Sequence, residues 1–366
     1  MIEHRFGSSA PLSLGVEEEL MILDAQTLDQ VGAVDRILAG AAGLELPGRY
    51  KTELFASVVE TNTGVCASVA EVDAALPALR SAAASIARAE GLAVAASGSH
   101  PFARPEAQPI VQEERYLTFL AYGGISVRHQ GVQGLHVHVG MPGADECWRC
   151  LELILPWLPV VLALSANAPW LGGELTGFAS NRAPVLVELP RAGAPPAFGS
   201  YAGWERWVER LTALGVAPDY TRIWWDVRPH PLLGTLEVRM PDQPTDVRLS
   251  AAFTALVQAL CAAALDGALA PAPAGGDRGR ADYAQNRWSA ARFGPRAELL
   301  HPDGRTVARA SELGAELLEL VAPAAASLGS AELLARIDPA GCEADLQARF
   351  ASAREAAADV VARSVP

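Results

Sequence analysis

Three short segments of the chain alternate between hydrophobic and polar residues, and a period of two is typical of a β-strand. These segments are residues 12–24 (LSLGVEEELMILD), 131–141 (GVQGLHVHVGM) and 235–240 (TLEVRM). A short apolar run at residues 92–98 predicts a further strand. Because residues i and i+2 of a strand point to the same side of a sheet, each alternating segment predicts one apolar face and one polar face.

Longer stretches of the chain predict helices. Residues 73–90 are rich in alanine, and residues 201–214 contain several Trp and Arg residues. A long apolar stretch covers residues 246–269 and opens at Asp246, and a further stretch, capped by Asp145, covers residues 145–163. Strands and helices do not follow a strict β–α–β order, which favours an α+β fold with a mainly antiparallel sheet.

No internal repeat or long linker divides the chain. Residues 1–366 are therefore expected to form one catalytic domain, with a mostly helical C-terminal part from about residue 282. Residues 270–280 (APAPAGGDRGR) are expected to be flexible. Residues 153–171 carry no charge but contain three prolines, so they predict a buried helix and a turn rather than a membrane span.

The chain is acidic, with a formal net charge of −13. An acidic surface repels phosphate backbones, which argues against nucleic acid as a partner. A nucleotide is compatible with this charge only if metal ions or a local basic pocket hold it. The five cysteines are odd in number and the N-terminal residues lack the apolar region of a signal peptide, so we expect reduced thiols and a cytoplasmic protein.

The polar face of the first alternating segment carries two carboxylates. Glu17 and Glu19 share this face, whereas Glu18 falls on the apolar face and is less convincing as a ligand. Two neighbouring carboxylates that face a cavity need a cation, and Mg²⁺ binds carboxylate oxygens. The alternative is a solvated acidic face without function.

The other two alternating segments also place chemically active groups on one face. His136 and His138 form one pair, and imidazole binds metals or donates hydrogen bonds to anions. Glu237 and Arg239 form the other pair, in which Glu237 is a candidate metal ligand and the planar Arg239 a candidate phosphate contact. The alternatives are two surface histidines and a simple neutralised ion pair.

A fourth segment, residues 51–64 (KTELFASVVETNTG), adds Glu53 and Glu60. Their odd separation places them on opposite faces of a continuous strand, although a bulge or turn near residues 56–57 would reunite them. Together the four segments predict a polynuclear magnesium site for phosphoryl transfer, in which the protein positions groups and neutralises charge.

Common nucleotide-binding and hydrolase motifs are absent. The sequence contains no G-x-x-x-x-G-K-[ST] loop, no G-x-G-x-x-G after a predicted strand and no G-x-S-x-G elbow. The single C-x-x-C at residues 147–150 lacks the second ligand pair of a structural zinc site.

The order of several motifs resembles the carboxylate–amine ligase family, also called glutamate–cysteine ligase type 2. The resemblance extends from about residue 14 to about residue 350. It is carried by GVEEEL, VVETNTGVC, ASGSHPFA, GLHVHVG, PWLPVVLALSANAPW, TGFASNR, WWDVRPHP, TLEVRMPD and QNRWSAARFG. Two departures stand out, since the family often has an aromatic residue at the position of Asn181 and the stretch FASVV before Glu60 is atypical.

The resemblance implies a fold like the catalytic domain of glutamine synthetase, in which a curved antiparallel sheet forms a funnel with helices outside. It also implies ATP and Mg²⁺ as cofactors. It further implies roles for eleven residues: the metal ligands Glu17, Glu19, Glu53, Glu60, His136 and Glu237, the phosphate contact Arg239, the substrate- or nucleotide-facing His138, and the substrate or phosphate contacts Arg182, Asn286 and Arg287.

The mechanism implied by the resemblance has two steps. A carboxylate attacks the γ-phosphorus of ATP to give an acyl phosphate, and an amine then attacks its carbonyl carbon to give an amide, ADP and phosphate. Glutamate and cysteine are the name-giving substrates, and a homodimer is expected by analogy. Two alternatives remain at this point, a metal-dependent amide hydrolase built on His136 and His138, and a non-catalytic nucleotide- or metal-binding protein.

Overall fold

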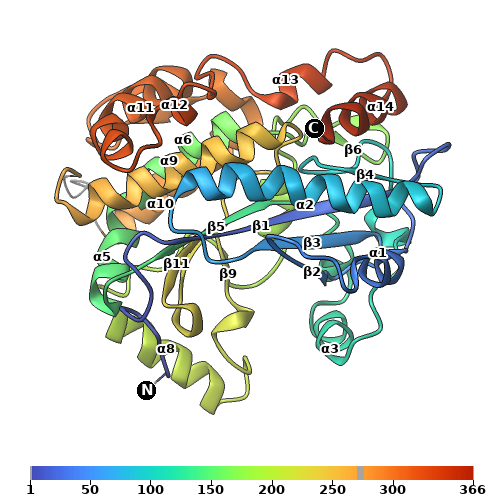
Figure 1. The fold of residues 1–366 in the computed structure, drawn as a ribbon. Helices are drawn as coiled ribbons and strands as arrows, with labels where there is room; N and C mark the ends of the chain where they lie inside the picture. The colour runs from blue at the N-terminus through green and yellow to red at the C-terminus, as the bar shows by residue number, and fades with distance from the viewer. Residues whose placement is uncertain (1, 270–275, 366) are drawn as a thin grey trace.

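A seven-stranded antiparallel sheet forms the centre of the molecule (Figure 1). The computed structural model of the chain describes residues 2–269 and 276–365. Six strands follow the order β10-β11-β5-β1-β3-β2, and β4 pairs with the C-terminal half of β1. The strands are β1 (Leu14–Asp24), β2 (Gly48–Thr52), β3 (Val58–Thr63), β4 (Leu92–Ala95), β5 (Leu135–Gly140), β10 (Val227–His230) and β11 (Thr235–Val238).

Helices cover one face of this sheet, which we call the helix face, and the opposite face is the site face. The long helices α2 (Val69–Ala89) and α9 (Val247–Leu265) pack against each other, α2 also packs on β1, β3 and β4, and α9 packs on β5 (Figure 1). The remaining helices are α1 (Val34–Ala41), α3 (Glu114–Gly123), α4 (Ile125–Arg128), α5 (Ala144–Ile154), α6 (Leu158–Ser165), α7 (Arg182–Leu186), α8 (Tyr201–Ala213), α10 (Gly276–Phe293), α11 (Ala310–Ser327), α12 (Ala331–Leu334), α13 (Glu343–Gln347) and α14 (Ala353–Ser364).

Six short strands lie outside the central sheet. They form the pairs β6 (Trp170–Leu171) with β7 (Glu174–Leu175), β8 (Ala192–Gly193) with β9 (Trp224–Trp225), and β12 (Glu298–Leu300) with β13 (Val307–Arg309). The predicted α+β class with a mainly antiparallel sheet is confirmed. The expected likeness of this fold to the funnel of the glutamine synthetase catalytic domain stays a prediction.

The alternation of the sequence explains the two faces of the sheet. Val16 of β1 and Val137 of β5 are paired residues on the helix face, and both belong to the core that α5, α6 and α9 complete. Burial of one such aliphatic side chain contributes about 1.5–3 kcal/mol. The apolar residues therefore fix the sheet against the helices and turn every second side chain to the site face.

Two sequence expectations need correction. The segment capped at residue 145 is not one helix, because α5 begins after Gly143 and a short 3₁₀ turn at Leu155–Trp157, which contains Pro156, separates it from α6. Residues 276–280 belong to helix α10, while residues 270–275 lie outside the described residues. The C-terminal part is mostly helical but includes the β12–β13 hairpin.

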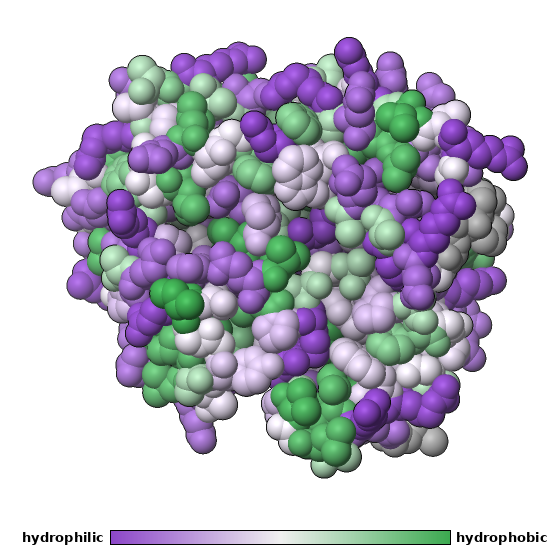
Figure 2. All heavy atoms as spheres, turned by 180° about the vertical axis from the view of Figure 1, so that it is seen from behind, coloured by the Kyte–Doolittle hydropathy of each residue, from purple (hydrophilic) through white to green (hydrophobic). Residues whose placement is uncertain are grey.

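Two helical stretches are long and apolar enough to cross a membrane by composition alone. They are Ala144–Ser165, which is 78% buried in its most apolar window, and Val247–Leu265, which is 89% buried. Such burial is typical of core helices, in line with the predicted buried helix. On the face shown in Figure 2, hydrophilic residues separate the larger hydrophobic areas.

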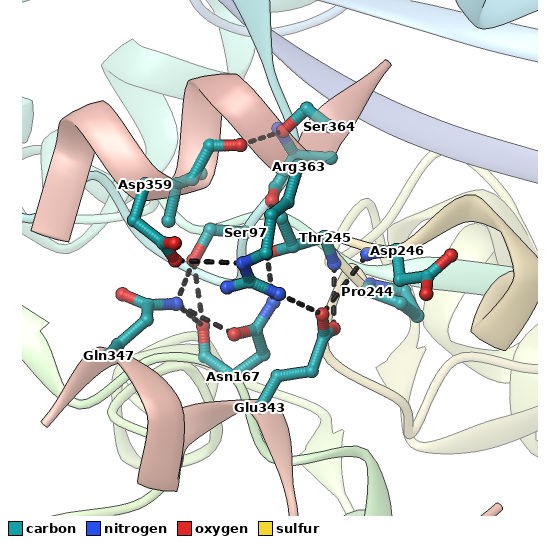
Figure 3. Close-up of polar contacts among 12 residues, drawn as sticks. Ser97, Asn167, Pro244, Thr245, Asp246, Glu343, Gln347, Asp359, Arg363 and Ser364 are labelled. Carbon is teal, nitrogen blue, oxygen red and sulfur yellow. Dashed lines mark hydrogen bonds and ion pairs between the residues drawn. The ribbon is translucent and has the colours of Figure 1, made fainter. Parts of the chain in front are cut away.

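A buried polar network ties the C-terminal segment to the sheet (Figure 3). The Glu343 carboxylate accepts hydrogen bonds from the backbone N–H groups of Thr245 and Asp246 at 2.7 and 3.0 Å, where α9 begins. The Arg363 guanidinium approaches the same carboxylate at 3.0 Å. The C-terminal helices therefore help to hold the turn between β11 and α9.

Candidate active site

The predicted polar residues of four strands form cross-strand neighbours on the site face. In the register of the sheet, Glu17 lies opposite His136, and His138 lies opposite Glu237. On the other side of β1, Glu19 lies opposite Glu60 of β3. The sheet therefore brings together groups that are far apart in the sequence, because directly opposite side chains lie about 5 Å apart.

The closest group of possible metal ligands is Glu17, His138 and Glu237, whose ligand atoms all lie within 4.8 Å of one another. His138 Nδ1 lies 3.0 Å from the Thr235 hydroxyl, and its buried Nε2 has no hydrogen-bond partner. His136 also contacts Glu17, with Nδ1 3.3 Å from the carboxylate. The structure thus places both histidines at the cluster and groups His138 with the predicted ligands Glu17 and Glu237.

Two arginines neutralise Glu237. Arg228 donates to both carboxylate oxygens, at 2.7 and 3.2 Å, and Arg239 Nη1 lies 2.5 Å from Oε1. Burial by itself raises the pKa of Glu237, but Arg228 and Arg239 outweigh it and hold the pKa well below its usual range. Glu237 is therefore a fixed negative charge with two cations beside it.

Glu19, Glu53 and Glu60 form the opposite electrostatic environment. Burial raises the pKa of Glu19 to about 7, although Arg182 and the Gly134 N–H act in the opposite direction. Burial and the nearby Glu19 and Glu60 raise the pKa of Glu53 to about 8, and burial and Glu17 also raise the pKa of Glu60. These carboxylates lack enough positive charge from the protein itself.

The position of Glu53 answers the question raised by its odd spacing. β2 ends at Thr52 and β3 begins at Val58, so Glu53 lies in the turn between them and is released from the strand parity. Its electrostatic interaction with Glu19 and Glu60 shows that the turn reunites it with the cluster.

Glu18 lies on the helix face, as its parity predicts. Its side chain is completely buried and bonded by Arg80 at 2.6 and 2.9 Å. The Ser250 hydroxyl and the Gln243 amide donate further hydrogen bonds to it, at 2.5 and 2.9 Å. Glu18 is thus outside the cluster of the site face.

The predicted contacts from α7 and α10 divide into two groups. Arg182 donates to the backbone oxygens of Arg239 and Met240, at 2.9 and 3.2 Å, so it lies directly beside the cluster. Arg287 binds the buried Asp226 carboxylate at 2.7 and 3.1 Å.

Asn286 is not brought to the cluster by its hydrogen bonds. Its amide nitrogen donates to the Leu300 carbonyl at 2.7 Å, and its amide oxygen accepts from the Leu300 N–H at 2.8 Å. Both ends of the side chain therefore hold the β12 strand against α10.

Sequence reasoning assigned no role to four residues that the structure places at the site. Arg228 binds Glu237, and Asn62 donates to Glu17 and Glu60 at 2.9 and 2.7 Å. Lys51 lies 3.3 Å from Glu60, and with Arg49 it lines a cavity of about 180 Å³ that also contacts Glu17 and His138. A period of two links Arg49, Lys51 and Glu53, and that pattern was the available signal.

The donor set fits hard divalent cations. Several buried carboxylates repel one another, His138 Nε2 is an orphaned buried nitrogen, and burial lowers the pKa of His136 to about 4, which leaves its imidazole neutral. Mg²⁺ prefers carboxylate oxygens, and neutral imidazole also binds metals. Bound cations would supply the positive charge that the protein does not provide here.

Comparison with known sequences gives a consistent result over most of the chain. A family model described as glutamate–cysteine ligase family 2 matches residues 13–356. A relative from Rubrobacter xylanophilus, provisionally named glutamate–cysteine ligase 2-3, is 39% identical over 97% of this chain and 92% of the relative. One from Herpetosiphon aurantiacus, provisionally named glutamate–cysteine ligase 2, is 35% identical over 90% of this chain and 85% of the relative.

Two solved structures have a similar fold. A glutamate–cysteine ligase from Francisella tularensis in complex with AMP has a TM-score of 0.64 and 13% identity, covering 97% of this chain and 89% of the other. A bifunctional glutathione synthetase from Pasteurella multocida has a TM-score of 0.65 and 13% identity, covering 97% and 52%. At this level of identity the similarity shows the fold alone.

Proposed function

The chain belongs to glutamate–cysteine ligase family 2, and from this premise we propose that it is an ATP-dependent ligase that joins a carboxylate to an amine. The observation that carries the proposal is a group of acidic residues held close together at the site, which includes the buried Glu19 and the partly buried Glu53 and Glu60. Family membership agrees with the ligase predicted from the sequence and gives no support to the amide hydrolase alternative.

We assign Mg²⁺ to the carboxylate cluster because its donors fit that ion. The residues that would hold it are Glu17, Glu19, Glu53, Glu60, His136 and Glu237. When bound, the ions would neutralise the phosphates of ATP and polarise the transferred phosphoryl group. His138 joins Glu17 and Glu237 in one triad, and its Nε2, which makes no hydrogen bond and lies 3.7 Å from Glu17, is the atom we assign to contact with a nucleotide or substrate.

The arginines of the site supply fixed positive charge. The Arg239 side chain is held by Glu237, to which Nη1 donates a hydrogen bond. The Arg239 backbone is held by Arg182, which donates a hydrogen bond to the Arg239 carbonyl. A guanidinium fixed in this way stabilises charge that develops on a phosphoryl group without having to reorganise. Arg287 is buried and all three of its guanidinium nitrogens are bonded to Asp226 or to the Ala183 carbonyl, so we expect it to position that region.

The proposed reaction follows from these roles. The substrate carboxylate attacks the γ-phosphorus of ATP, which forms an acyl phosphate and releases ADP. The amine then attacks the acyl carbon and phosphate leaves. The protein needs no nucleophile of its own, because its residues bind, orient and neutralise the reacting groups.

We propose glutamate as the acid and cysteine as the amine, because the relatives carry these substrates in their names. ATP is the proposed phosphate donor. We also infer that residues 1–366 act as one catalytic domain, because Arg80 joins Glu18 of β1 to the Ser364 carbonyl at the C-terminal end of the chain. The cytoplasmic location, the homodimer and the absence of a nucleic-acid or membrane partner stay predictions.

The test is phosphate release from Mg-ATP with amino acids offered singly and in pairs. The ligase predicts release that requires one acid and one amine together, with an equimolar amide product detected by mass spectrometry. Amide cleavage without ATP, together with no stimulation by any pair, would contradict it.

A further inference from the structure

A groove that contains two arginines lies between α3 and residues 215–222. The groove encloses about 160 Å³ and is lined by Phe119, Tyr122, Arg191, Val216 and Arg222, among other residues, none of them acidic. In a chain with a net charge of −13, a groove lined by two arginines and no carboxylate is an exception. Such a local positive field attracts anions.

The two arginines of this groove are not neutralised by the protein. Arg191 donates from Nε to the Arg222 carbonyl at 2.9 Å and from both terminal nitrogens to the Tyr122 hydroxyl at 3.2 Å. Arg222 donates to the Arg115 carbonyl at 3.2 Å. Within residues 2–269 and 276–365, neither guanidinium has a carboxylate within ion-pair distance. Their charges are therefore available to a ligand.

Aromatic rings hold the guanidinium groups in place. Phe119 and Trp224 are stacked with centroids 4.9 Å apart. The Arg222 guanidinium lies 5.3 Å from the Phe119 ring, and that of Arg191 lies 5.7 Å from both the Tyr122 and Trp224 rings. Ring faces attract cations, so they orient the arginines without cancelling their charge.

The backbone at Arg191 is also unusual. Its φ angle of 60° lies in the left-handed region, which residues other than glycine rarely adopt. The Arg191 carbonyl accepts from the Trp224 N–H at 2.9 Å, which fixes this conformation. Strained residues concentrate at ligand sites, where the surrounding structure maintains them.

Hydrogen bonds connect the groove to the carboxylate cluster from two sides. The turn that contains Arg222 offers the carbonyls of Thr221 and Ile223 to Arg228, the residue that binds Glu237. On the other side, the Tyr116 hydroxyl of α3 donates to the Thr52 carbonyl at 2.8 Å, directly before Glu53. The segment that carries Arg222 is therefore bonded to a residue that holds Glu237, and α3 is bonded to the residue before Glu53.

We propose that Arg191 and Arg222 bind the non-reacting carboxylate of an amino-acid substrate. Planar guanidinium groups match a carboxylate, and the groove is small compared with the roughly 300–1,000 Å³ of pockets that enclose drug-sized ligands. Its size suits the carboxylate end of an amino acid. This inference rests on the proposed ligase function and specifies its substrate class.

The test compares Arg191→Gln and Arg222→Gln with wild type and with the control Arg354→Gln. Arg354 is matched in chemistry, since it also lies over an aromatic ring, Phe102 at 4.9 Å, and bonds to a backbone carbonyl, but it belongs to α14. KM and kcat are measured for ATP and for each amino acid of the active pair. The same series is repeated with amino acids whose non-reacting carboxylate is converted to an amide.

We expect each groove variant to raise KM for one amino acid by roughly tenfold to a hundredfold, the usual effect of losing a hydrogen bond to a charged group. KM for ATP and the control variant should stay unchanged. With the amide analogue, wild type and variants should have equal kcat/KM, a result that general structural damage does not produce. Unchanged KM for both amino acids, or a rise in KM for ATP instead, would overturn the inference.

Failure of the proposed function is recognised separately, as a wild-type protein that releases no phosphate with any pair. Calorimetric titration with L-glutamate and with L-cysteine then still decides the inference. Binding to wild type that is lost in Arg191→Gln supports the groove. Equal binding to both proteins, or none to wild type, overturns it.

Discussion

Glu18 and Glu19 are neighbours on strand β1, yet they lie in opposite electrostatic environments. On the helix face, Glu18 is completely buried and its charge is matched by Arg80, Ser250 and Gln243. On the site face, Glu19 faces other carboxylates, and burial raises its pKa to about 7. One face of the same strand is electrostatically complete, and the other needs cations to complete it.

The difference separates residues that stabilise the fold from those that we propose to bind metal ions. Arg80 also donates to the carbonyls of Thr245 and Ser364, so the Glu18 pair connects β1, the turn before α9 and the C-terminus. The site face instead keeps negative charges close together at a cost in stability. A bound metal ion removes that cost, which couples metal binding to the charge state of the cluster.

The largest expected effect comes from removing a carboxylate of the site face. Glu19→Ala should lower kcat/KM for ligation by on the order of 10³-fold or more, because one ligand of the proposed metal cluster is lost. Its free energy of unfolding in EDTA should change by only about 1 kcal/mol, since the lost Gly134 hydrogen bond is offset by relieved repulsion. Phosphate-release assays and urea denaturation measure the two quantities, with exposed Glu45→Ala as the control. Full activity in Glu19→Ala would contradict the metal assignment.

Breaking the Glu18 pair should have the opposite profile. Arg80→Met leaves a buried carboxylate without its cation, so the free energy of unfolding should fall by about 3–5 kcal/mol. Urea denaturation tests this, and Arg88→Met at an exposed position of the same helix is the control. A Glu18→Leu, Arg80→Met double variant should recover part of the loss. An Arg80→Met protein as stable as wild type would refute the structural role of the pair.

Asn286 allows the ligand-binding and structural roles to be compared at one residue. The family resemblance implies that it contacts a ligand, whereas in the structure its side chain bonds to the backbone of Leu300. Asn286→Ala should reduce the free energy of unfolding by about 1–3 kcal/mol, since it leaves the Leu300 backbone unpaired. KM for ATP should change less than about twofold. Exposed Gln285→Ala serves as the control. A large rise in KM for ATP with normal stability would restore the ligand role.

The smallest expected effect is a pH dependence of the metal-free protein. Carboxylates with raised folded pKa values, about 7 for Glu19 and about 8 for Glu53, bind more protons in the folded than in the unfolded state above pH 4.5. Stability in EDTA should therefore fall as pH rises from 6.5 to 8, by on the order of 1 kcal/mol. The raised pKa of His138 acts in the same direction, while the lowered pKa of His136 acts only below pH 6.5.

Thermal unfolding measured across this pH range provides the check. Glu53→Gln should flatten the slope, and Mg²⁺ should raise the melting temperature more at pH 8 than at pH 6.5, because the ion binds the deprotonated carboxylates. A slope of the opposite sign, or one unaffected by Glu53→Gln, would show that these groups are not the source.

Much of the sheet could be predicted because local patterns carried the information. Alternation correctly placed Glu17 and Glu19 on one face and Glu18 on the other, and it paired His136 with His138 in the same way. Glu53 was left undecided because a turn, which has no fixed side-chain period, connects it to β3. The roles of Asn62 and Lys51 were missed because they depend on the register of β3 with its neighbours.

The sequence by itself determined the two faces of each strand, the apolar helices that cover the sheet and the family to which the chain belongs. These properties follow from period, composition and motif order, which are local along the chain. Only the tertiary structure decided which charges neutralise each other. Arg80 and Glu18 neutralise each other although many residues separate them, whereas Arg191 and Arg222 meet in one groove without a carboxylate. Electrostatic interactions depend on distance in space and on burial, neither of which one sequence specifies.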